Sequence, residues 1–256
     1  MRGFAIDATV PPDVAEAVAV AAQDAGYGSF WVNGSPHGGA LDIIERAARS
    51  TDLDLGVGVF ALPRISADEL VSEVRGRALP QDRLWLGVGS NRKPGALAEV
   101  RSAVEMLRNE LDVTVVTAAV GPKMTTLAGE VADAAIFTWW IKQDVERSRV
   151  LLEEGAAAAG RKPPGVVSYI RCALLPEAAD AVAERAEVYA AIPRYQEVFA
   201  RNGMTAVDTV VTGTSRAELL PGIEREESVL DIPVIRAIPA ADTVAALSAL
   251  VTACAP

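Results

Sequence analysis

Histidine and cysteine are scarce in this chain, which has one histidine, His37, and two cysteines, Cys172 and Cys254, among 256 residues. A single histidine excludes a His-rich metal site, and it excludes a Ser-His-Asp triad unless His37 is its base. The two cysteines are far apart in the sequence and form no CxxC pair, which argues against a disulfide scaffold or a zinc ribbon. We therefore expect no metal site and assign the cysteines to packing.

Long apolar runs and a surplus of basic residues are also missing. No stretch approaches the ~20 apolar residues of a membrane span, and residues 1–7 are too poor in apolar side chains for a signal peptide. Acidic residues outnumber basic ones by 34 to 24, giving a formal net charge of −10. This balance argues against binding to nucleic acid or to anionic membranes. We expect a cytoplasmic protein. The acidic balance does not exclude an anionic small ligand, because a few amides and one basic side chain can hold a phosphate.

What the chain does have is hydrophobic residues in two alternating periods. Half of its residues are hydrophobic, which excludes a disordered chain. Short β-rich runs alternate with longer Ala-rich segments of helical period. We expect strands at residues 3–7, 29–32, 53–60, 84–88, 113–118, 134–138, 166–174 and 233–237. Helices are expected at about 12–26, 40–50, 144–159, 177–201, 215–224 and 241–253, with others starting near residues 66, 94 and 122.

Strict alternation of eight strands with helices predicts a (β/α)8 barrel. A doubly wound open sheet is the alternative, and the absence of a GxGxxG motif after the first strand weakens it. No linker, repeat or low-complexity tract divides the chain. We therefore expect residues 1–256 to form one barrel domain.

Chemistry in such a barrel is expected on the loops that follow the carboxyl ends of the strands. Candidate positions there are Asp7, 33–37, 60–64, 89–93, 117–123, 138–142 and Arg236. The most informative segment is 118–124, where small residues follow a strand and Gly121 and Pro122 precede a helix. Free amides at that helix start could bind a phosphate, with help from Lys123 and from the Thr138 hydroxyl. An ordinary strand-to-helix turn is the alternative, and the spacing alone favours it.

Three further segments carry candidates. Gly87 and Gly89 in the fourth strand would let a flat ring lie against the barrel mouth, although close packing explains them equally well. His37 could donate a proton, but a solvated loop histidine is the commoner case. The pair Trp139-Trp140 could stack on an aromatic ring or pack beneath a helix.

In the order of these segments, the chain resembles the bacterial luciferase-like monooxygenases, especially the branch that uses the deazaflavin coenzyme F420. The resemblance rests on AAQDAGYGSFWV at 21–32, LGVGV and LPR at 55–64, RLWLGVG at 83–89, and AAVGPK at 118–123. It continues through LAGE at 127–130 and ADA at 132–134. No single piece is specific, but their shared order and spacing carry the resemblance.

The resemblance implies a TIM barrel with F420, or alternatively FMN, across its carboxyl-terminal mouth. It implies a phosphate at the amides around Gly121 and at Thr138, and a ring near Val59, Val88 and Gly89. It also implies a non-proline cis peptide at Gly58–Val59. The cofactor-binding residues expected in this way are Asn33, Gly58, Val59, Val88, Gly89, Ala119, Val120, Gly121, Pro122 and Thr138. A small-molecule substrate and a homodimer are the partners that the resemblance implies.

The chain departs from the family in its acid–base residues. Where members often carry an Asp/Glu-His pair, this chain has Gly34-Ser35, with His37 displaced from that position. Where some deazaflavin sugar-phosphate dehydrogenases have a glutamate, it has Ser90. His37 and Ser90 are therefore the candidate catalytic residues. The chain is also short, which predicts shortened insertions and a shallow, open site, or a site closed by another protein.

These observations lead to two hypotheses. The first is an oxidoreductase that moves hydride between F420 and an organic substrate, with an FMN-dependent monooxygenase as its variant. The second is a barrel that binds the (deaza)flavin without turnover, or no flavin at all, since a fold does not fix a function.

Overall fold

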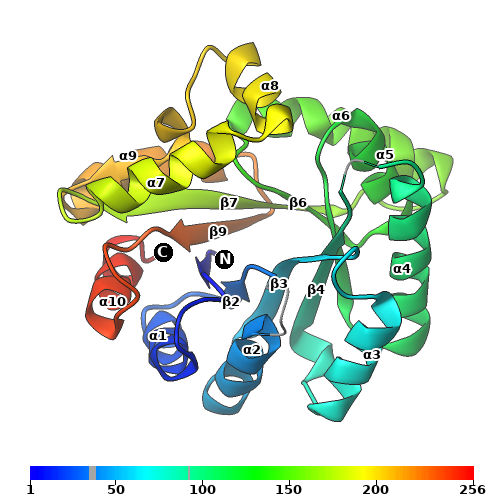
Figure 1. Cartoon of the computed structure of the whole chain (residues 1–256), viewed down its shortest axis with the longest axis horizontal. Coiled ribbons are helices and arrows are strands. Elements are labelled where there is room, and N and C mark those ends of the chain that lie inside the picture. The colour runs from blue at the N-terminus through cyan, green and yellow to red at the C-terminus, as the bar shows by residue number, and fades with distance from the viewer. Residues whose placement is uncertain (35–38, 92) are drawn as a thin grey trace.

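The fold is a closed parallel barrel, seen in a computed structural model that describes residues 1–34, 39–91 and 93–256 (Figure 1). Its strands are β1 Gly3–Ile6, β2 Ser29–Val32, β3 Asp54–Ala61, β4 Leu84–Gly89, β5 Thr114–Ala118, β6 Ala134–Phe137, β7 Gly165–Leu174, β8 Val211–Gly213 and β9 Ile232–Ala237. All pairings are parallel, and the strands from β1 to β7 follow one another in order. Strand β9 pairs with both β7 and β1, which closes the barrel. The predicted (β/α)8 barrel is confirmed.

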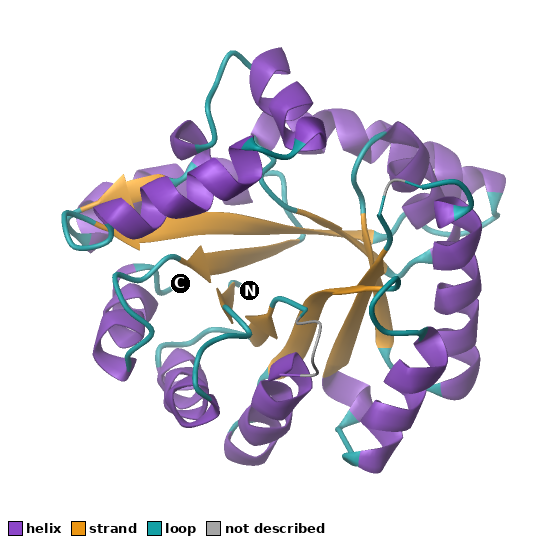
Figure 2. Ribbon diagram, viewed as in Figure 1, coloured by secondary structure: helices purple, strands orange, loops and turns teal. Residues whose placement is uncertain are grey.

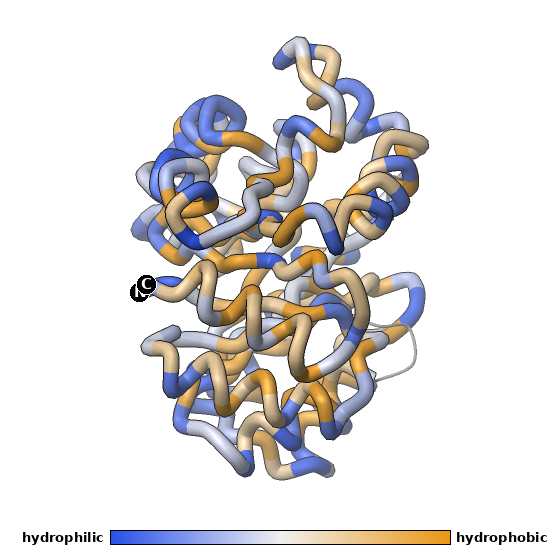
Figure 3. The backbone as a smooth tube through the Cα atoms, turned by 90° about the vertical axis from the view of Figure 1, so that its left-hand side faces the viewer, coloured by the Kyte–Doolittle hydropathy of each residue, from blue (hydrophilic) through white to orange (hydrophobic). Residues whose placement is uncertain are grey.

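Helices follow the strands along the chain and surround the barrel (Figure 2). They are α1 Pro12–Asp24, α2 Gly39–Ser50, α3 Ala67–Gly76, α4 Ala96–Glu110, α5 Pro122–Val131, α6 Lys142–Ala158, α7 Ala179–Ala190, α8 Pro193–Arg201, α9 Arg216–Glu227 and α10 Val244–Ala253. Their turns alternate between hydrophilic and hydrophobic residues in Figure 3, as expected for helices with one face on a sheet. Among the described residues, no helix is both long and apolar enough to cross a membrane.

Two details differ from the sequence expectation, and both lie after β7. The helical stretch expected at 177–201 is two helices, because Ile192 adopts an extended conformation (φ −91°, ψ 117°) before Pro193. Proline disfavours helical geometry in the residue that precedes it. The short strand β8 was not expected; it adds to the end of β7 outside the closed barrel. These changes place α7 and α8 over one side of the mouth.

The barrel interior is filled by side chains towards the amino ends of the strands. Trp31 on β2 is fully buried, and its indole nitrogen donates a hydrogen bond to Ser29 Oγ (2.8 Å). A Cβ atom on Gly56 of β3 would lie 2.2 Å from the Trp31 ring, so glycine leaves the space that the indole occupies. Inward-facing side chains such as Val116, Val167 and Val234 pack in the same cluster. The barrel is therefore plugged at this end, and a ligand can enter only from the other end.

Candidate cofactor and substrate site

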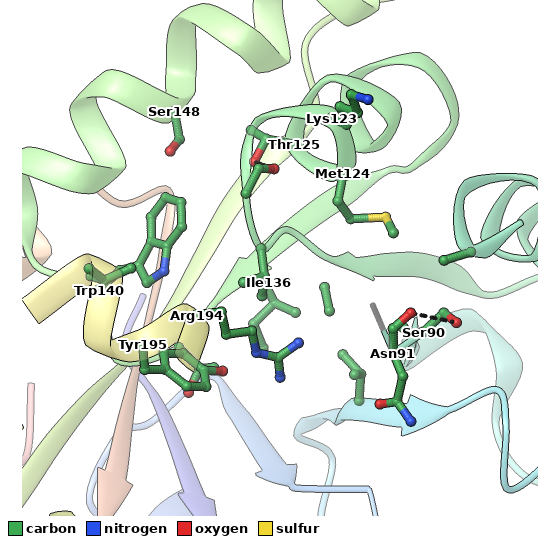
Figure 4. A pocket seen from close by; sticks show the side chains of 18 of the residues that line it. Ser90, Asn91, Lys123, Met124, Thr125, Ile136, Trp140, Ser148, Arg194 and Tyr195 are labelled. Atoms are coloured by element: carbon green, nitrogen blue, oxygen red, sulfur yellow. Dashed lines mark hydrogen bonds between the residues drawn. The ribbon is translucent and has the colours of Figure 1, made fainter. Parts of the chain in front are cut away.

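A cavity of about 1270 Å³ opens at the carboxyl ends of the barrel strands. This volume exceeds the range of roughly 300–1,000 Å³ typical of small-molecule pockets. Its wall includes the ends of β3, β4, β5 and β6, the start of α5, and residues from α6, α7 and α8 (Figure 4). Residues of α7 and α8 add a wall to one side of the mouth.

The start of α5 forms one end of the cavity. Gly121 caps this helix with φ 82° and ψ 158°, a conformation that side-chain-bearing residues rarely adopt. Pro122 occupies the first turn, and the hydroxyl and amide of Thr125 both bind the Gly121 carbonyl (3.0 Å each). A Cβ on Gly121 would meet no atom within 4 Å, so the open side of this turn is accessible. The first-turn amides of α5 are thus available to an anion.

Thr138 follows β6 and is held by a buried arginine that the sequence analysis missed. Arg171 on β7 is 6 % exposed and donates a hydrogen bond from Nη2 to Thr138 Oγ1 (2.6 Å). Its guanidinium lies over the Trp139 ring (3.9 Å to the centroid), and burial lowers the pKa of Arg171 to about 10. No carboxylate of the described residues lies within 4 Å of it. Because Thr138 accepts from Arg171, its own hydroxyl hydrogen is free to point at an anion in the cavity.

The opposite wall holds the segment expected to support the ring. The Gly58–Val59 peptide is cis, as the resemblance implied. Tyr169 Oη donates a hydrogen bond to the Gly58 carbonyl (3.0 Å), and burial raises the pKa of this phenol. A Cβ on Gly58 would lie 2.5 Å from Tyr169 Oη. Gly58, Val59 and Gly89 all line the cavity.

The structure brings most of the expected cofactor residues to this cavity. Those that line it are Asn33, Gly58, Val59, Gly89, Val120, Gly121, Pro122 and Thr138. Val88 and Ala119 do not, because both side chains are fully buried behind the wall. Asn33 is also engaged within the protein, since its Oδ1 accepts a hydrogen bond from the Ala8 amide (2.8 Å).

The two candidate catalytic residues have different outcomes. Ser90 lines the cavity, where its hydroxyl donates a hydrogen bond to Glu99 on α4. The ammonium of Lys93 also contacts Glu99 (2.9 Å). These interactions hold the pKa of Glu99 below its usual value. His37 lies outside the described residues.

Asp7 and Arg236, two of the strand-end candidates, form an ion pair at the mouth. Asp7 contacts Arg236 (2.7 Å) and Arg185 of α7 (2.6 Å), and the side chains of Asp7 and Arg236 are 13 % and 8 % exposed. Burial alone would raise the pKa of Asp7, but the two guanidinium groups hold it below its ordinary value. Arg185 could not be predicted from the sequence, because α7 reaches the mouth only through the tertiary fold.

We expect Asp7→Asn to lower the free energy of unfolding by about 2 kcal/mol at pH 7, because two guanidinium groups lose a charged acceptor. A depressed folded-state pKa stabilises the protein above the unfolded pKa near 4, and this contribution disappears as pH falls through the folded-state value. Urea unfolding at pH 7 and at pH 3 measures the free energy of unfolding of the wild type and of Asp7→Asn. The difference between the two free energies should be smaller at pH 3. An equal difference at both pH values would contradict the ion pairs assigned to Asp7.

Positive charge dominates the cavity wall although the protein is acidic overall. The acidic residues in the wall are Asp144 and Glu197, and the basic ones are Lys93, Lys123, Arg147, Arg185, Arg194, Arg201 and Arg236. Asp144 is 1 % exposed and forms ion pairs with both Arg147 (3.3 Å) and Arg201 (2.5 Å), so its single negative charge offsets only one of their two positive charges. The cavity is therefore suited to ligands with negative charge.

The described residues fit a cofactor of the (deaza)flavin kind on three grounds. Open amides and a free hydroxyl meet at the Gly121–Thr138 end, and an uncharged wall of small residues lies near Val59 and Gly89. Trp140, which stacks on Phe137 (4.8 Å between centroids), has a buried indole nitrogen with no hydrogen-bond partner among the described residues. Among those residues, no group of three or more His, Cys, Asp or Glu could hold a metal ion.

Comparison with known proteins agrees with this geometry. The family model of luciferase-like monooxygenases matches residues 94–217, just under half of the chain. The resemblance to luciferase-like monooxygenases is confirmed. No curated protein matches the chain in sequence. The matched region covers helix α4 through the start of α9 and therefore includes the Gly121 turn, Thr138 and Arg171.

Solved structures share the luciferase-like barrel at low sequence identity. An F420-dependent secondary alcohol dehydrogenase, in complex with an F420-acetone adduct, is 16% identical with a TM-score of 0.74, covering 98% of this chain and 97% of that one. The coenzyme F420-dependent tetrahydromethanopterin reductase of Methanopyrus kandleri is 15% identical, with a TM-score of 0.76 and coverages of 97% and 96%. A type II Baeyer-Villiger monooxygenase of Pseudomonas putida, in complex with FMN, is 13% identical, with a TM-score of 0.66 and coverages of 100% and 98%. At these identities the similarity establishes the fold.

Proposed function

We propose that the protein is an oxidoreductase that moves hydride between F420, bound at the barrel mouth, and a small organic substrate. The single observation that carries this proposal is the end of the cavity where the free amides of α5 meet the Thr138 hydroxyl, backed by the buried Arg171. The three structural neighbours described above are a dehydrogenase, a reductase and a monooxygenase, which supports the reaction class. F420 is preferred to FMN because the two structural neighbours with the higher TM-scores are F420-dependent.

In this proposal, a bound deazaflavin supplies the hydride chemistry, and the chain's residues bind, orient and shield. Thr138 and the α5 amides would hold the cofactor phosphate. Val59 and Gly89 offer the flat apolar surface for the ring, and Tyr169 fixes the Gly58 carbonyl beneath it. Ser90 is the hydroxyl at the mouth that could donate or accept a proton, and Glu99 holds it in place.

Two alternatives have specific support. FMN would suit the same residues, and the Pseudomonas putida neighbour is in complex with FMN. Binding without turnover would follow from the missing acid–base pair after the second strand, where Gly34 stands. A Cβ at Gly34 would lie 2.0 Å from the Val59 carbonyl oxygen, so an acidic side chain does not fit there in this backbone.

Titration of the purified protein with F420, and separately with FMN, tests the proposal through the cofactor's own fluorescence. Thr138→Val should weaken the binding of the preferred cofactor by roughly ten- to a hundredfold, the cost of one hydrogen bond to a charged group. Thr117→Val is the matched control. Thr117 lies on the neighbouring strand β5, its buried hydroxyl has no hydrogen-bond partner among the described residues, and it does not line the cavity. Equal affinity of the two variants would contradict the phosphate assignment.

A further inference from the structure

The cavity contains one arginine that none of the roles above uses. Arg194 is the second residue of α8 and is half-buried. Figure 4 shows its guanidinium pointing into the cavity, on the far side of Ile136 from the α5 residues Thr125 and Lys123. In this view Arg194 therefore lies apart from the start of α5. Through Tyr195 and Tyr189 its surroundings extend to Arg171, whose guanidinium carbon lies 5.6 Å from the centroid of the Tyr189 ring.

The charge of Arg194 is not neutralised within the described part of the chain. The other arginines of the cavity wall pair with Asp7 or Asp144, and Lys93 pairs with Glu99. No carboxylate of the described residues lies within 4 Å of Arg194, although Glu197 follows one turn later on the same helix. Its Nε atom is buried and has no hydrogen-bond partner there either. A buried, unpartnered donor on a charged group is costly unless a ligand supplies the acceptor.

The surroundings of Arg194 are aromatic. Its guanidinium carbon lies 5.0 Å from the centroid of the Tyr195 ring, and Tyr195 in turn packs edge-on against Tyr189 (5.2 Å). Tyr189 and Tyr195 both line the cavity. An apolar body can pack on these rings while an oxyanion takes the planar fork of the guanidinium.

We propose that the substrate is an organic anion whose carboxylate or phosphate group pairs with Arg194 and whose apolar body packs on Tyr189 and Tyr195. The inference rests on the proposed function in that it assigns the remaining part of the same cavity to the substrate. It adds the substrate class, which the fold leaves open. α8 thereby becomes the element that selects substrates by charge.

Calorimetric titration of the purified protein with benzoate, phenyl phosphate and benzyl alcohol tests this inference without turnover. At least one of the two anions should bind about tenfold or more tightly than the neutral alcohol, because a charge-assisted hydrogen bond contributes about 1.5–3 kcal/mol. Arg194→Gln should remove that preference. Arg46→Gln, which removes an exposed arginine paired with Glu16 far from the cavity wall, should keep it.

The outcomes separate this inference from the proposed function. Equal binding of all three probes, or an anion preference that survives in Arg194→Gln, overturns the anionic substrate. A loss of F420 or FMN affinity in Arg194→Gln also overturns it, because Arg194 would then belong to the cofactor. Failure of the wild-type protein to bind either cofactor contradicts the proposed function, whereas an Arg194-dependent preference for the anions would still stand.

Discussion

A tryptophan in place of Gly121 is expected to abolish the binding of F420 and FMN. The Cβ of residue 121 would face open space at the start of α5, so the indole would occupy the volume where the phosphate meets the helix amides. The same change strains the backbone, because residue 121 has φ 82° and ψ 158°. Such strain costs on the order of 1–3 kcal/mol, so a stability loss accompanies the binding loss.

Gly121→Ala separates the two effects. It carries the same backbone strain without the bulk of the indole, and the two variants should therefore have similar melting temperatures. Fluorescence titration should show measurable cofactor binding in Gly121→Ala and none in Gly121→Trp. Equal affinities in the two variants would place the phosphate elsewhere.

Trp31→Ala is expected to lower the free energy of unfolding by about 4 kcal/mol, near the middle of the range for buried aromatic truncations. The indole fills the closed end of the barrel between Gly3 and Gly56 and packs against Trp85 (5.9 Å between centroids). Strands that are paired on both sides can shift little to close the resulting cavity. Urea unfolding followed by circular dichroism measures the loss.

Two comparisons show whether that loss comes from the barrel interior. Trp31→Phe keeps an aromatic ring in the closed end of the barrel and should lose clearly less stability than Trp31→Ala. Cofactor affinity, measured where both variants are folded, should match the wild type because Trp31 does not line the mouth. A loss below about 1 kcal/mol in Trp31→Ala would show that the barrel end is not closed by this side chain.

The barrel could be predicted from the sequence because its signals are local. Apolar runs such as residues 53–60 identify strands that are buried on both faces. The helix expected to start near residue 66 is α3, which begins with a capping box of Ser66 and Glu69. The break before Pro193 was missed because an Ala-rich helical period masks a single proline. The three-residue strand β8 is too short to show any alternation.

The candidate site was predictable only where it is built from strand ends. The Gly121 turn and Thr138 follow consecutive strands, and parallel strands bring such residues to one edge. Arg171 was missed, although a lone arginine within the apolar run at 166–174 was a usable signal of an inward-facing charge. Arg194 could not be predicted, because its place in the cavity depends on how α7 and α8 pack over the mouth.

A crystal structure of the protein in complex with F420, or with FMN if that cofactor binds more tightly, would show directly whether the cofactor phosphate lies at the start of α5. We expect the phosphate within hydrogen-bonding distance of Thr138 Oγ1 and of the first amides of α5, with the ring against Val59 and Gly89. Arg194 should then remain free of the cofactor and face open space beside Tyr195. A phosphate bound to Arg194, or a cofactor outside the barrel mouth, would contradict the account.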